Sequence, residues 1–345
     1  MRMLMPDSRL NEAEHLLQHS FMKSPIFNGL LMAMAVAAGY LPMRALPARS
    51  ALPPATVALH YRPIEIETVV GPLRLAGAWK VSVADSRFGG ISSLTIDRGR
   101  FLAVSDRGSV ARFDLPGGRD PRAWVADLRE GPGPWGSKWG RDAEALAADP
   151  DGRGWWVGYE QIHSVWLYDG DFDHALSRIE LNRPDWRDNR GAEGLLADRG
   201  GLLITAENGR DAMLVDLHRT ERMDLNAGAD VAEAATAPDG SSWLLLRSKG
   251  RQGISQSIVQ LWKVDSGYRT GSAMPLPKGA FDNYEGMAIE PQPGGGWRFW
   301  LITDDGHRLM ARTMLVALDF MPPARQDKSP AASAGLQRNA SVTKN

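Results

Sequence analysis

The 345-residue chain contains no cysteine. This absence excludes disulfide bonds, thiolate metal sites and cysteine nucleophiles together, and it also excludes a lipid anchor on an N-terminal cysteine. Oxygen and imidazole groups are then the ligands that remain for a metal ion. Any metal site in this protein must therefore be built from carboxylate or carbonyl oxygen, with histidine as the one nitrogen donor.

A strong net charge is also lacking. The formal net charge is −1, and no run of lysine or arginine is interleaved with aromatic residues. Proteins that bind DNA or RNA depend on a basic patch that faces the phosphate backbone. The composition therefore argues against a nucleic-acid partner, and it does not exclude a small anionic ligand.

Several common catalytic signatures are missing. The chain has no Gly-x-Ser-x-Gly elbow, no His-Glu-x-x-His motif and no P-loop, so a serine hydrolase or zinc protease has little support. The segment Gly131–Gly136 formally matches a dinucleotide-binding fingerprint. Its two prolines, and the lack of a strand before it and a helix after it, make it a loop instead.

The N-terminal segment resembles a secretory signal. An apolar stretch runs from Pro25 to Met43, with Lys23 before it and small residues after it, and its core is short for a membrane span. Met22 is a more natural start for such a signal than Met1. We therefore interpret residues 1–50 as a leader and expect a periplasmic or secreted protein. An uncleaved inner-membrane anchor and a buried helix of the domain are the alternatives.

The remainder of the chain predicts one globular domain followed by a tail. Residues 322–345 are polar, rich in small residues and without periodicity, which is typical of a disordered segment. Residues 65–320 contain short apolar runs separated by turns such as Asp97-Arg98-Gly99, and few stretches are long enough for a helix. The domain is therefore expected to be all-β.

The apolar runs recur in units of roughly 40 to 50 residues with several strands each, which is the signature of a β-propeller. Five units are clear. A sixth can be assembled from Leu73–Val81, closed by a strand from the opposite end of the domain, because closure removes exposed sheet edges. The prediction is a propeller of five or six blades, and the 12 tryptophans and 36 glycines agree with it.

Acidic residues recur at two places in these units. One acid precedes the first strand, at Glu144, Glu193, Glu233 and Glu285, whereas Ser93 takes that place in the first unit. A second acid follows the second strand, at Asp106, Glu160, Glu207 and Asp304, whereas Arg247 takes that place in the fourth unit. Because equivalent residues of successive blades form a ring, these side chains are expected to converge.

Converging carboxylates repel one another unless a cation, a proton or an arginine neutralises them. Carboxylate oxygen without thiolate suits Ca²⁺ better than Zn²⁺. We therefore predict a calcium site, with the following candidate ligands: Asp106, Glu144, Glu160, Glu193, Glu207, Glu285 and Asp304. The alternative is that these acids cap turns, accept hydrogen bonds from the backbone or pair with neighbouring residues.

Basic residues lie beside the acids, and an anionic substrate bound to a metal needs such donors. The candidate substrate-binding residues are Arg107, Lys138, Arg141, Arg190, Arg210 and Arg247, and the alternative is that they are solvated loop charges or ion-pair partners. Glu144 and Glu193 are candidates for the base, and His307 is the candidate catalytic histidine. A histidine in such a place can equally be structural.

Several of these motifs resemble one family. They are Glu144-Ala145-Leu146, Glu193-Gly194-Leu195, Val104-Ser105-Asp106-Arg107-Gly108, Gly158-Tyr159-Glu160 and Thr303-Asp304-Asp305-Gly306. Over Gly71 to Leu318 the chain resembles the phytase-like domain family, also called the "esterase-like activity of phytase" family, whose members are mostly exported bacterial proteins. The resemblance implies a β-propeller rich in acidic residues and the hydrolysis of phosphoesters.

Together these features predict an exported, calcium-dependent phosphoester hydrolase in which the bound metal binds phosphate and polarises a water molecule. One alternative is a non-catalytic propeller that binds a ligand or protein partner and uses metal only to hold its blades. Another is a metal-dependent lactonase or carboxylic esterase, because metal-centred propellers also support that chemistry.

The leader generates the first testable prediction. When the full chain is expressed in a Gram-negative host, we expect the protein outside the cytoplasm, with a mature start between Ala38 and Ser50. Cell fractionation followed by N-terminal sequencing measures both features. Recovery from the cytoplasm with an intact N-terminus would contradict the export prediction.

Overall fold

The computed structural model describes residues 50–66, 71–181, 186, 191–198, 201–216, 219–251, 253–264, 267–277, 283–307 and 312–321. The predicted leader, the predicted tail and Arg190 lie outside the described residues. Within these ranges the chain is built from β-strands and turns, so the all-β prediction is confirmed. The one helical element in this part is the single turn α3 (Lys138–Arg141), and none of the described residues form a helix long and apolar enough to cross a membrane.

The turns between strands follow from local sequence chemistry. At Asp149-Pro150-Asp151-Gly152, the backbone N–H of Gly152 donates to the carbonyl of Asp149 at 2.9 Å. Gly152 has φ of 71°, a conformation that glycine adopts without the steric cost of a Cβ atom. The Asp149 carboxylate accepts a hydrogen bond from the backbone N–H of Arg153 at 3.2 Å, which tightens the turn further. The chain therefore reverses here and forms a hairpin.

Five antiparallel units, which we call blades, contain the described strands. The first blade contains β3 (Ile91–Asp97), β4 (Arg100–Ser105), β5 (Ser109–Asp114) and β6 (Arg122–Asp127). The second contains β7 (Ala143–Ala148), β8 (Gly154–Tyr159), β9 (Ser164–Asp169) and β10 (Ala175–Glu180). The third contains β11 (Ala192–Asp198), β12 (Gly201–Ala206), β13 (Asp211–Val215) and β14 (Thr220–Asp224).

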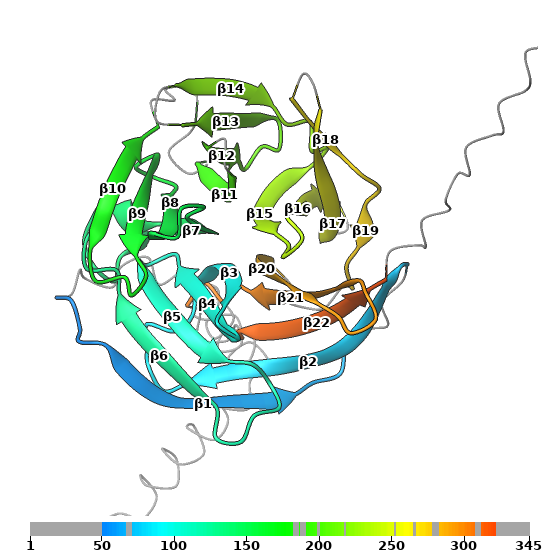
Figure 1. Cartoon of the computed structure of the whole chain (residues 1–345). Helices are drawn as coiled ribbons and strands as arrows, with labels where there is room; N and C mark the ends of the chain where they lie inside the picture. Colours follow the sequence, from blue (N-terminus) through cyan, green and yellow to red (C-terminus); the bar gives the residue numbers. More distant parts are fainter. Residues whose placement is uncertain are drawn as a thin grey trace, which may run out of the picture.

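The fourth blade contains β15 (Asp230–Thr236), β16 (Ser242–Gly250), β17 (Gly253–Val264) and β18 (Gly267–Thr270), and the short β19 (Met274–Pro275) also pairs with β17. The fifth contains β20 (Tyr284–Pro291), β21 (Trp297–Thr303), β22 (Met314–Phe320) and β2 (Leu73–Val83). The first strand of each blade contacts the first strand of the next, in the order β3, β7, β11, β15, β20 and back to β3. Figure 1 shows these five strands around the centre of a propeller-like ring.

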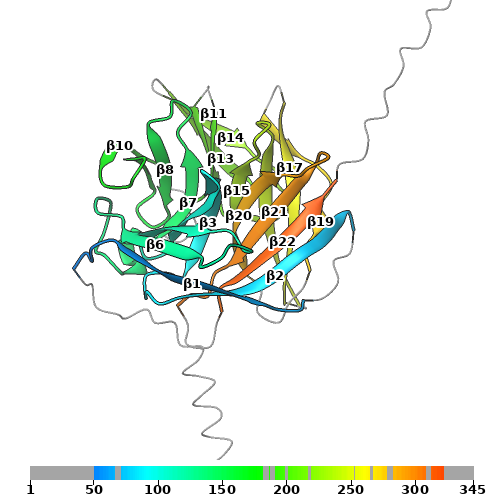
Figure 2. The same ribbon diagram turned by 60° about the horizontal axis from the view of Figure 1, so that its bottom comes forward.

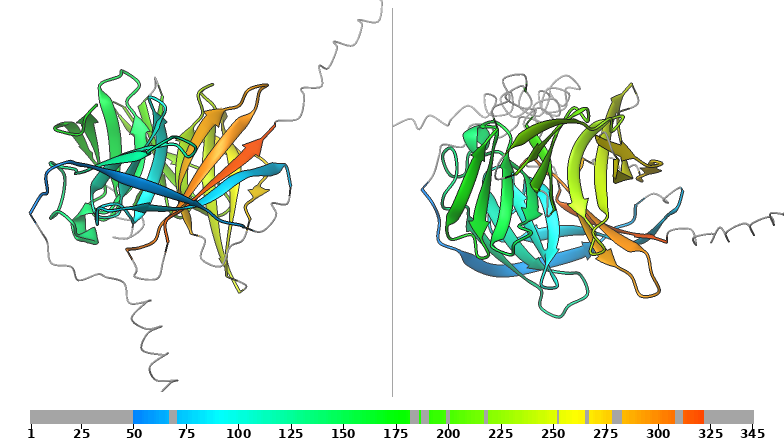
Figure 3. Two further views of the ribbon diagram at one scale, coloured as in Figure 1. Left: turned by 90° about the horizontal axis from the view of Figure 1, so that it is seen from below. Right: turned by 45° about the horizontal axis from the view of Figure 1, so that its top comes forward.

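The ring is closed by strands from the N-terminal side of the domain. The segment predicted to start a sixth blade is instead the outer strand β2 of the fifth blade, where Leu73 pairs with Phe320. The predicted closure by a strand from the opposite end is therefore confirmed, and the described strands form no sixth blade. Strand β1 (Ala55–Pro63) pairs with both β2 and β6, which joins the fifth and first blades into one nine-stranded sheet. Figures 2 and 3 show β1 and β2 along the outside of the ring.

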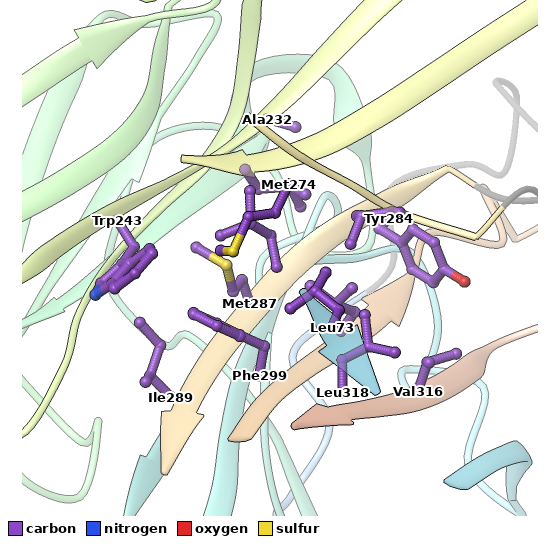
Figure 4. Close-up of a cluster of buried hydrophobic side chains, with 14 of the residues drawn as sticks. Leu73, Ala232, Trp243, Met274, Tyr284, Met287, Ile289, Phe299, Val316 and Leu318 are labelled. Carbon is purple, nitrogen blue, oxygen red and sulfur yellow. The ribbon is translucent and has the colours of Figure 1, made fainter. Parts of the chain in front are cut away.

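The hydrophobic core is divided among the junctions between blades. Five clusters of buried side chains occupy the five junctions. Figure 4 shows the junction of the fourth and fifth blades, where Trp243 of β16 packs near Met287 and Phe299. On β20, Met287 belongs to this cluster and the next residue, Ala288, to the junction with the first blade. Alternation along a strand thus supplies both of its faces with apolar side chains.

The first strands of the blades approach one another closely where a glycine follows the acid. A Cβ atom placed on Gly286 would lie 2.9 Å from the Leu94 Cβ and 3.1 Å from the Leu94 backbone nitrogen on β3. A Cβ atom on Gly194 would lie 2.6 Å from the Ala234 Cβ on β15. The Glu-Gly motif therefore has a packing reason, because glycine lets neighbouring first strands meet at the centre of the ring.

This close approach generates a stability prediction. We expect Gly286→Ala to lower the free energy of unfolding by about 1–3 kcal/mol, because the added methyl group overpacks the contact with β3. Gly250→Ala is the matched control, since a Cβ atom there would meet only a carbonyl oxygen at 3.9 Å. We expect the control to change the free energy of unfolding by no more than about 0.5 kcal/mol. Urea denaturation measures both, and equal effects would refute the packing argument.

Candidate functional site

The site begins at a β-bulge near the start of each first strand. In each of these strands, one residue has no partner in the pairing with the second strand of its blade. The paired positions jump from Ala143 to Ala145 in β7, from Ala192 to Gly194 in β11 and from Tyr284 to Gly286 in β20. The extra, unpaired residues are Glu144, Glu193 and Glu285. A bulge redirects the side chain of its extra residue. Three of the predicted acids therefore occupy equivalent positions in the ring, as the sequence repeat predicted.

The bulge register corrects the repeat in the two other blades. In β3 the pairing passes from Ile91 to Ser93, and in β15 it passes from Val231 to Glu233. The residues equivalent to the three glutamates are therefore Ser92 and Ala232. Ser93 and Glu233 lie one position later, so their sequence alignment with the acids was wrong by one residue.

Glu233 accordingly makes a different set of contacts. Its side chain accepts hydrogen bonds from the backbone N–H groups of Ala234 at 2.9 Å and of Leu94, on β3, at 3.3 Å. Burial raises its pKa well above the usual range, although the hydrogen bonds from both backbone groups oppose that shift. Glu233 therefore satisfies buried backbone donors, which is the structural alternative to ligand binding.

The second set of acids lies at the same end of the hairpins. The backbone N–H groups of Asp106, Glu160 and Asp304 donate to carbonyls two residues before the bulge, at 2.8, 2.9 and 3.1 Å. This pairing brings each second acid beside the first strand of its own blade. We call the following residues the central acidic cluster: Asp106, Asp142, Glu144, Glu160, Glu193, Glu207, Glu285 and Asp304.

The tightest part of this cluster is a triad of carboxylates in the second blade. Asp142, Glu144 and Glu160 are all buried, and each places an oxygen within 4.8 Å of the others. Glu144 and Glu160 were predicted as ligands and are brought together. Asp142 was not predicted as a ligand. The sequence feature that could have identified it is its spacing, because it lies two residues before the predicted ligand Glu144. Gln161 fixes it by donating to Asp142 Oδ2 at 3.0 Å.

Lys138 places its ammonium group against this triad. Its Nζ atom lies 3.0 Å from Asp142 Oδ1, 3.1 Å from Glu144 Oε1 and 3.6 Å from Asp106 Oδ2. The lysine belongs to α3, in the loop that leads from the first blade to the second. Lys138 was predicted to bind substrate, and that role stays a prediction; in this structure its partners are carboxylates.

Electrostatics divide the triad into groups with different protonation. Burial and the charge of Glu144 raise the pKa of Asp142 to about 12 and that of Glu160 to about 7. Burial also opposes ionisation of Glu144, but the charge of Lys138 and the hydrogen bonds from Asp142, Ser92 and Lys138 together outweigh burial and lower the pKa of Glu144. For Lys138, partial loss of hydration around the ammonium favours the neutral amine, but the charges of Glu144, Asp142 and Asp106 together outweigh it and raise the pKa of Lys138. One proton and one ammonium group therefore partly neutralise the triad.

Glu193 lies between the triad and the opposite side of the ring. Its side chain is buried, and burial together with the charges of Glu144, Glu160 and Glu285 raises its pKa well above the usual range. The charge of Arg247 opposes that rise. Glu193 is therefore a carboxyl group that favours the protonated form until a positive charge is brought to it.

Arg247 neutralises the other side of the ring. Its guanidinium donates to Glu285 Oε1 at 2.8 Å and to Glu207 Oε1 at 3.0 Å. It also donates to Asn283 Oδ1 at 3.2 Å, and the Lys249 ammonium lies 3.5 Å from Glu207 Oε1. The predicted ligands Glu207 and Glu285 are thus already paired with a fixed cation, whereas among the described residues no arginine or lysine forms an ion pair with Glu160.

His307 and Asp106 form a further contact at the edge of the cluster. His307 Nε2 lies 3.5 Å from Asp106 Oδ1, and neither atom has a hydrogen-bond partner within the described part of the chain. The His307 backbone N–H donates to Asp305 Oδ1 at 2.9 Å, which holds the turn. Burial, with the charges of Glu285 and Asp106, raises the pKa of Asp304 well above its usual range. The predicted acids Asp106 and Asp304 therefore join the cluster, with His307 beside them.

Two predicted substrate-binding arginines have other positions. Arg141 is buried, and its guanidinium donates to the carbonyls of Leu128, Gly131, Pro132 and Gly133. It organises the loop that carries Lys138, so the prediction that it binds substrate was wrong.

Arg210 lines a separate polar cavity of 740 Å³, together with residues such as Asn208 and Arg222. It is not among the residues that contact the central acidic cluster. Arg107 directly follows Asp106 and is half-buried. Of the six predicted basic residues, Lys138 and Arg247 therefore contact the acids, and Arg190 lies outside the described residues.

The donor set of the triad fits a hard cation. Three carboxylates supply up to six oxygen atoms, and Ca²⁺ takes six to eight oxygen ligands. The positively charged Lys138 ammonium already lies against Asp142 and Glu144, in the place where a metal ion would bind. The triad is therefore suited to hold a metal ion.

Comparisons with solved structures reveal distant similarity. The luciferin-regenerating enzyme has a TM-score of 0.43 and 9% identity, with 78% of this chain and 96% of that chain covered. The catalytic domain of the Coprinopsis cinerea GH62 alpha-L-arabinofuranosidase has a TM-score of 0.43 and 12% identity, with 76% and 97% covered. For Kuenenia stuttgartiensis hydrazine synthase the TM-score is 0.38 and the identity 17%, and 62% of this chain matches only 56% of that one. Likenesses this remote carry no argument about function, and among curated proteins none matches the chain.

A family match is more informative. The family described as "Phytase-like: Esterase-like activity of phytase" matches residues 86–307. This range contains the first strands of all five blades and every residue of the central acidic cluster. The match covers well over half of the chain, and the chain therefore belongs to the phytase-like family.

Proposed function

We propose that this protein is an exported, calcium-dependent phosphoester hydrolase whose single domain is a five-bladed propeller. The observation that carries the proposal is the triad Asp142, Glu144 and Glu160, three buried carboxylates with oxygens within 4.8 Å of one another. Burying carboxylates together is unfavourable unless a cation compensates them, so such an arrangement is expected where a cation is used. Membership of the phytase-like family supports a phosphoester as the substrate class.

Asp142, Glu144 and Glu160 would hold the metal, and Glu193 lies beside them. A divalent cation at this site supplies Lewis-acid polarisation and positive charge for an anionic substrate. Calcium fits better than zinc, because the triad offers only oxygen and calcium accepts many oxygen ligands in flexible geometry. An exported location would supply calcium.

The chain's own cations and acids provide the remaining groups. Lys138 lies against Glu144, and the charge of Arg247 acts on Glu193, so both cations belong to the cluster and are of the type that binds phosphate oxygens. Glu193 is the residue that we assign as the base, because its raised pKa falls when positive charge approaches and it then ionises beside the substrate. His307, paired with Asp106, is placed to exchange a proton with a leaving group at the edge of the cluster.

A second candidate function is a non-catalytic propeller in which the acids hold the blades together. The observation that favours it is Arg247, which links Glu207 of the third blade to Glu285 of the fifth at 3.0 and 2.8 Å. Lys138 similarly contacts Asp106 of the first blade and Glu144 of the second. In this second function a bound metal ion would add further contacts between acids of different blades, and the protein would hydrolyse no substrate.

Metal binding provides a first test of the proposal. At a calcium concentration of 100 Kd, binding to the folded state adds about 2.7 kcal/mol to the free energy of unfolding, so Tm should rise, and a chelator should reverse the rise. We expect Glu160→Gln to lose the calcium-induced shift, because it removes one triad charge. Glu233→Gln is the matched control, since Glu233 is bonded to backbone groups. Calorimetry that detects no calcium binding to the wild type would refute the metal site.

Turnover provides a second test. With calcium present, we expect hydrolysis of bis(p-nitrophenyl) phosphate, p-nitrophenyl phosphate or phytate, and we expect Glu193→Gln to lower kcat by about 100-fold or more. Its calcium affinity should change by less than about tenfold, because Glu193 is not one of the triad. Metal binding without turnover would favour the non-catalytic function. Turnover of lactones or carboxylic esters alone would favour that other hydrolase class.

A further inference from the structure

The contacts of Lys138 have a consequence for how a metal reaches the triad. The ammonium lies within 3.1 Å of oxygens on two of the three triad members, Asp142 and Glu144. A calcium ion bound to the same Asp142 oxygen at about 2.4 Å would lie at most about 5.5 Å from the nitrogen atom. Two positive charges would then share the same two carboxylates in a buried site, where charges are poorly screened.

The lysine side chain has room to move away. Its exposed fraction is 45%, whereas those of the triad carboxylates Asp142 and Glu144 are 0% and 7%. Solvent therefore reaches the lysine from the outer side of the site. Exchange of the ammonium for a metal ion would require only rotation about the bonds of this side chain and no change in the ring of strands.

The loop that carries the lysine is held independently of the ammonium contacts. Arg141 donates to four backbone carbonyls of this loop, and the Gly140 backbone N–H donates to Gln161 Oε1 at 3.0 Å. A Cβ atom on Gly133 would lie 2.6 Å from the Gly140 carbonyl carbon, so the two arms of the loop are in contact. Loss of the Lys138 contacts therefore leaves the loop backbone in place.

The carboxylates themselves require a partner at this position. Asp142 Oδ1 is buried, and among the described residues the cation that lies against it is the Lys138 ammonium, at 3.0 Å. The same ammonium lies 3.6 Å from Asp106 Oδ2, whereas Asp106 Oδ1 faces His307 Nε2 at 3.5 Å. Arg247 cannot replace the lysine, because its donors are directed to Glu207 and Glu285. Apart from protonation of the acids themselves, either the lysine or an added cation must therefore compensate this side of the cluster.

We propose that Lys138 is a tethered cation that occupies the triad when metal is absent, and that a divalent cation binds in exchange for its ammonium group. The exchange lowers the apparent metal affinity and releases the ammonium to the solvent side of the site. There it is available to an anionic substrate once the metal is bound. This last step depends on the proposed phosphoester function, whereas the exchange itself does not.

Substitution of the lysine tests the exchange. We expect metal-free Lys138→Met to melt at a lower temperature than the wild type and to bind calcium at least tenfold more tightly in calorimetry. Lys138→Arg, which keeps the charge, should bind calcium more weakly than Lys138→Met. The control is Lys249→Met, another exposed lysine that contacts an acid of the cluster, and its calcium affinity should stay within threefold of the wild type. Equal or weaker calcium binding by Lys138→Met overturns the proposal.

The outcomes separate this proposal from the proposed function. Calcium binding by Lys138→Met but not by the wild type supports the exchange and refutes a calcium-dependent activity of the wild type. Equal binding by both leaves the metal site standing and refutes the exchange. Binding by neither refutes both.

A measurement on the wild type removes any dependence on the folding of a variant. Brief acetylation followed by peptide mass spectrometry reports how accessible each lysine is. We expect saturating calcium to increase modification of Lys138 severalfold and to leave Lys249 unchanged. Protection of Lys138 by calcium, or no change, overturns the exchange.

Discussion

The structure depends on one electrostatic constraint, which is that many carboxylates are buried at the centre of a small ring. Burial and mutual repulsion raise the pKa values of Asp142, Glu160 and Glu193. Without positive charges nearby, these side chains would therefore be protonated. The protein compensates one side with Arg247, whose donors are fixed by Glu207 and Glu285. It compensates the other side with Lys138, a lysine whose side chain is 45% exposed. This asymmetry makes the triad the place where an external cation is most useful.

The scaffold explains why the acids meet at all. Each blade starts with a bulged strand, and the extra residue of that bulge projects differently from its neighbours. Glycine after the glutamate, as at Gly194 and Gly286, lets adjacent first strands approach more closely than a Cβ atom would permit. The five apolar junctions then hold the blades at fixed angles around the centre. Packing between blades therefore offsets the cost of bringing like charges together at their first strands.

The sequence predicted much of this arrangement, because a repeat exposes equivalent positions. Strand type, the five clear units and the shared places of Glu144, Glu193 and Glu285 follow from the repeat alone. The sequence could not reveal that Glu233 lies one residue after the bulge position that glutamate occupies in the other blades. A bulge changes the pairing register of a strand without changing the spacing of its apolar residues. Asp142 was overlooked because it looked like a flanking charge. Arg141 was misassigned because proximity in sequence to an acid does not reveal four carbonyl partners.

The residues that follow the second strands differ among the blades in a way that bears on function. Four blades end their second strand in an acid, and the fourth blade places Arg247 there. If these side chains only held the blades together, an acid or an arginine could form the ion pairs between blades equally well. Which blade carries the arginine would then have little effect on the protein. Here the arginine occupies the blade next to Glu193 and pairs with two acids at once, whereas the cation against the triad, within the part of the chain that the structure describes, is a lysine that solvent can reach. The charge at the centre of the ring is therefore asymmetric. On one side the acids are paired with Arg247, and on the other side the proposed exchange of Lys138 for a metal ion adds positive charge. An anionic ligand would bind on that second side.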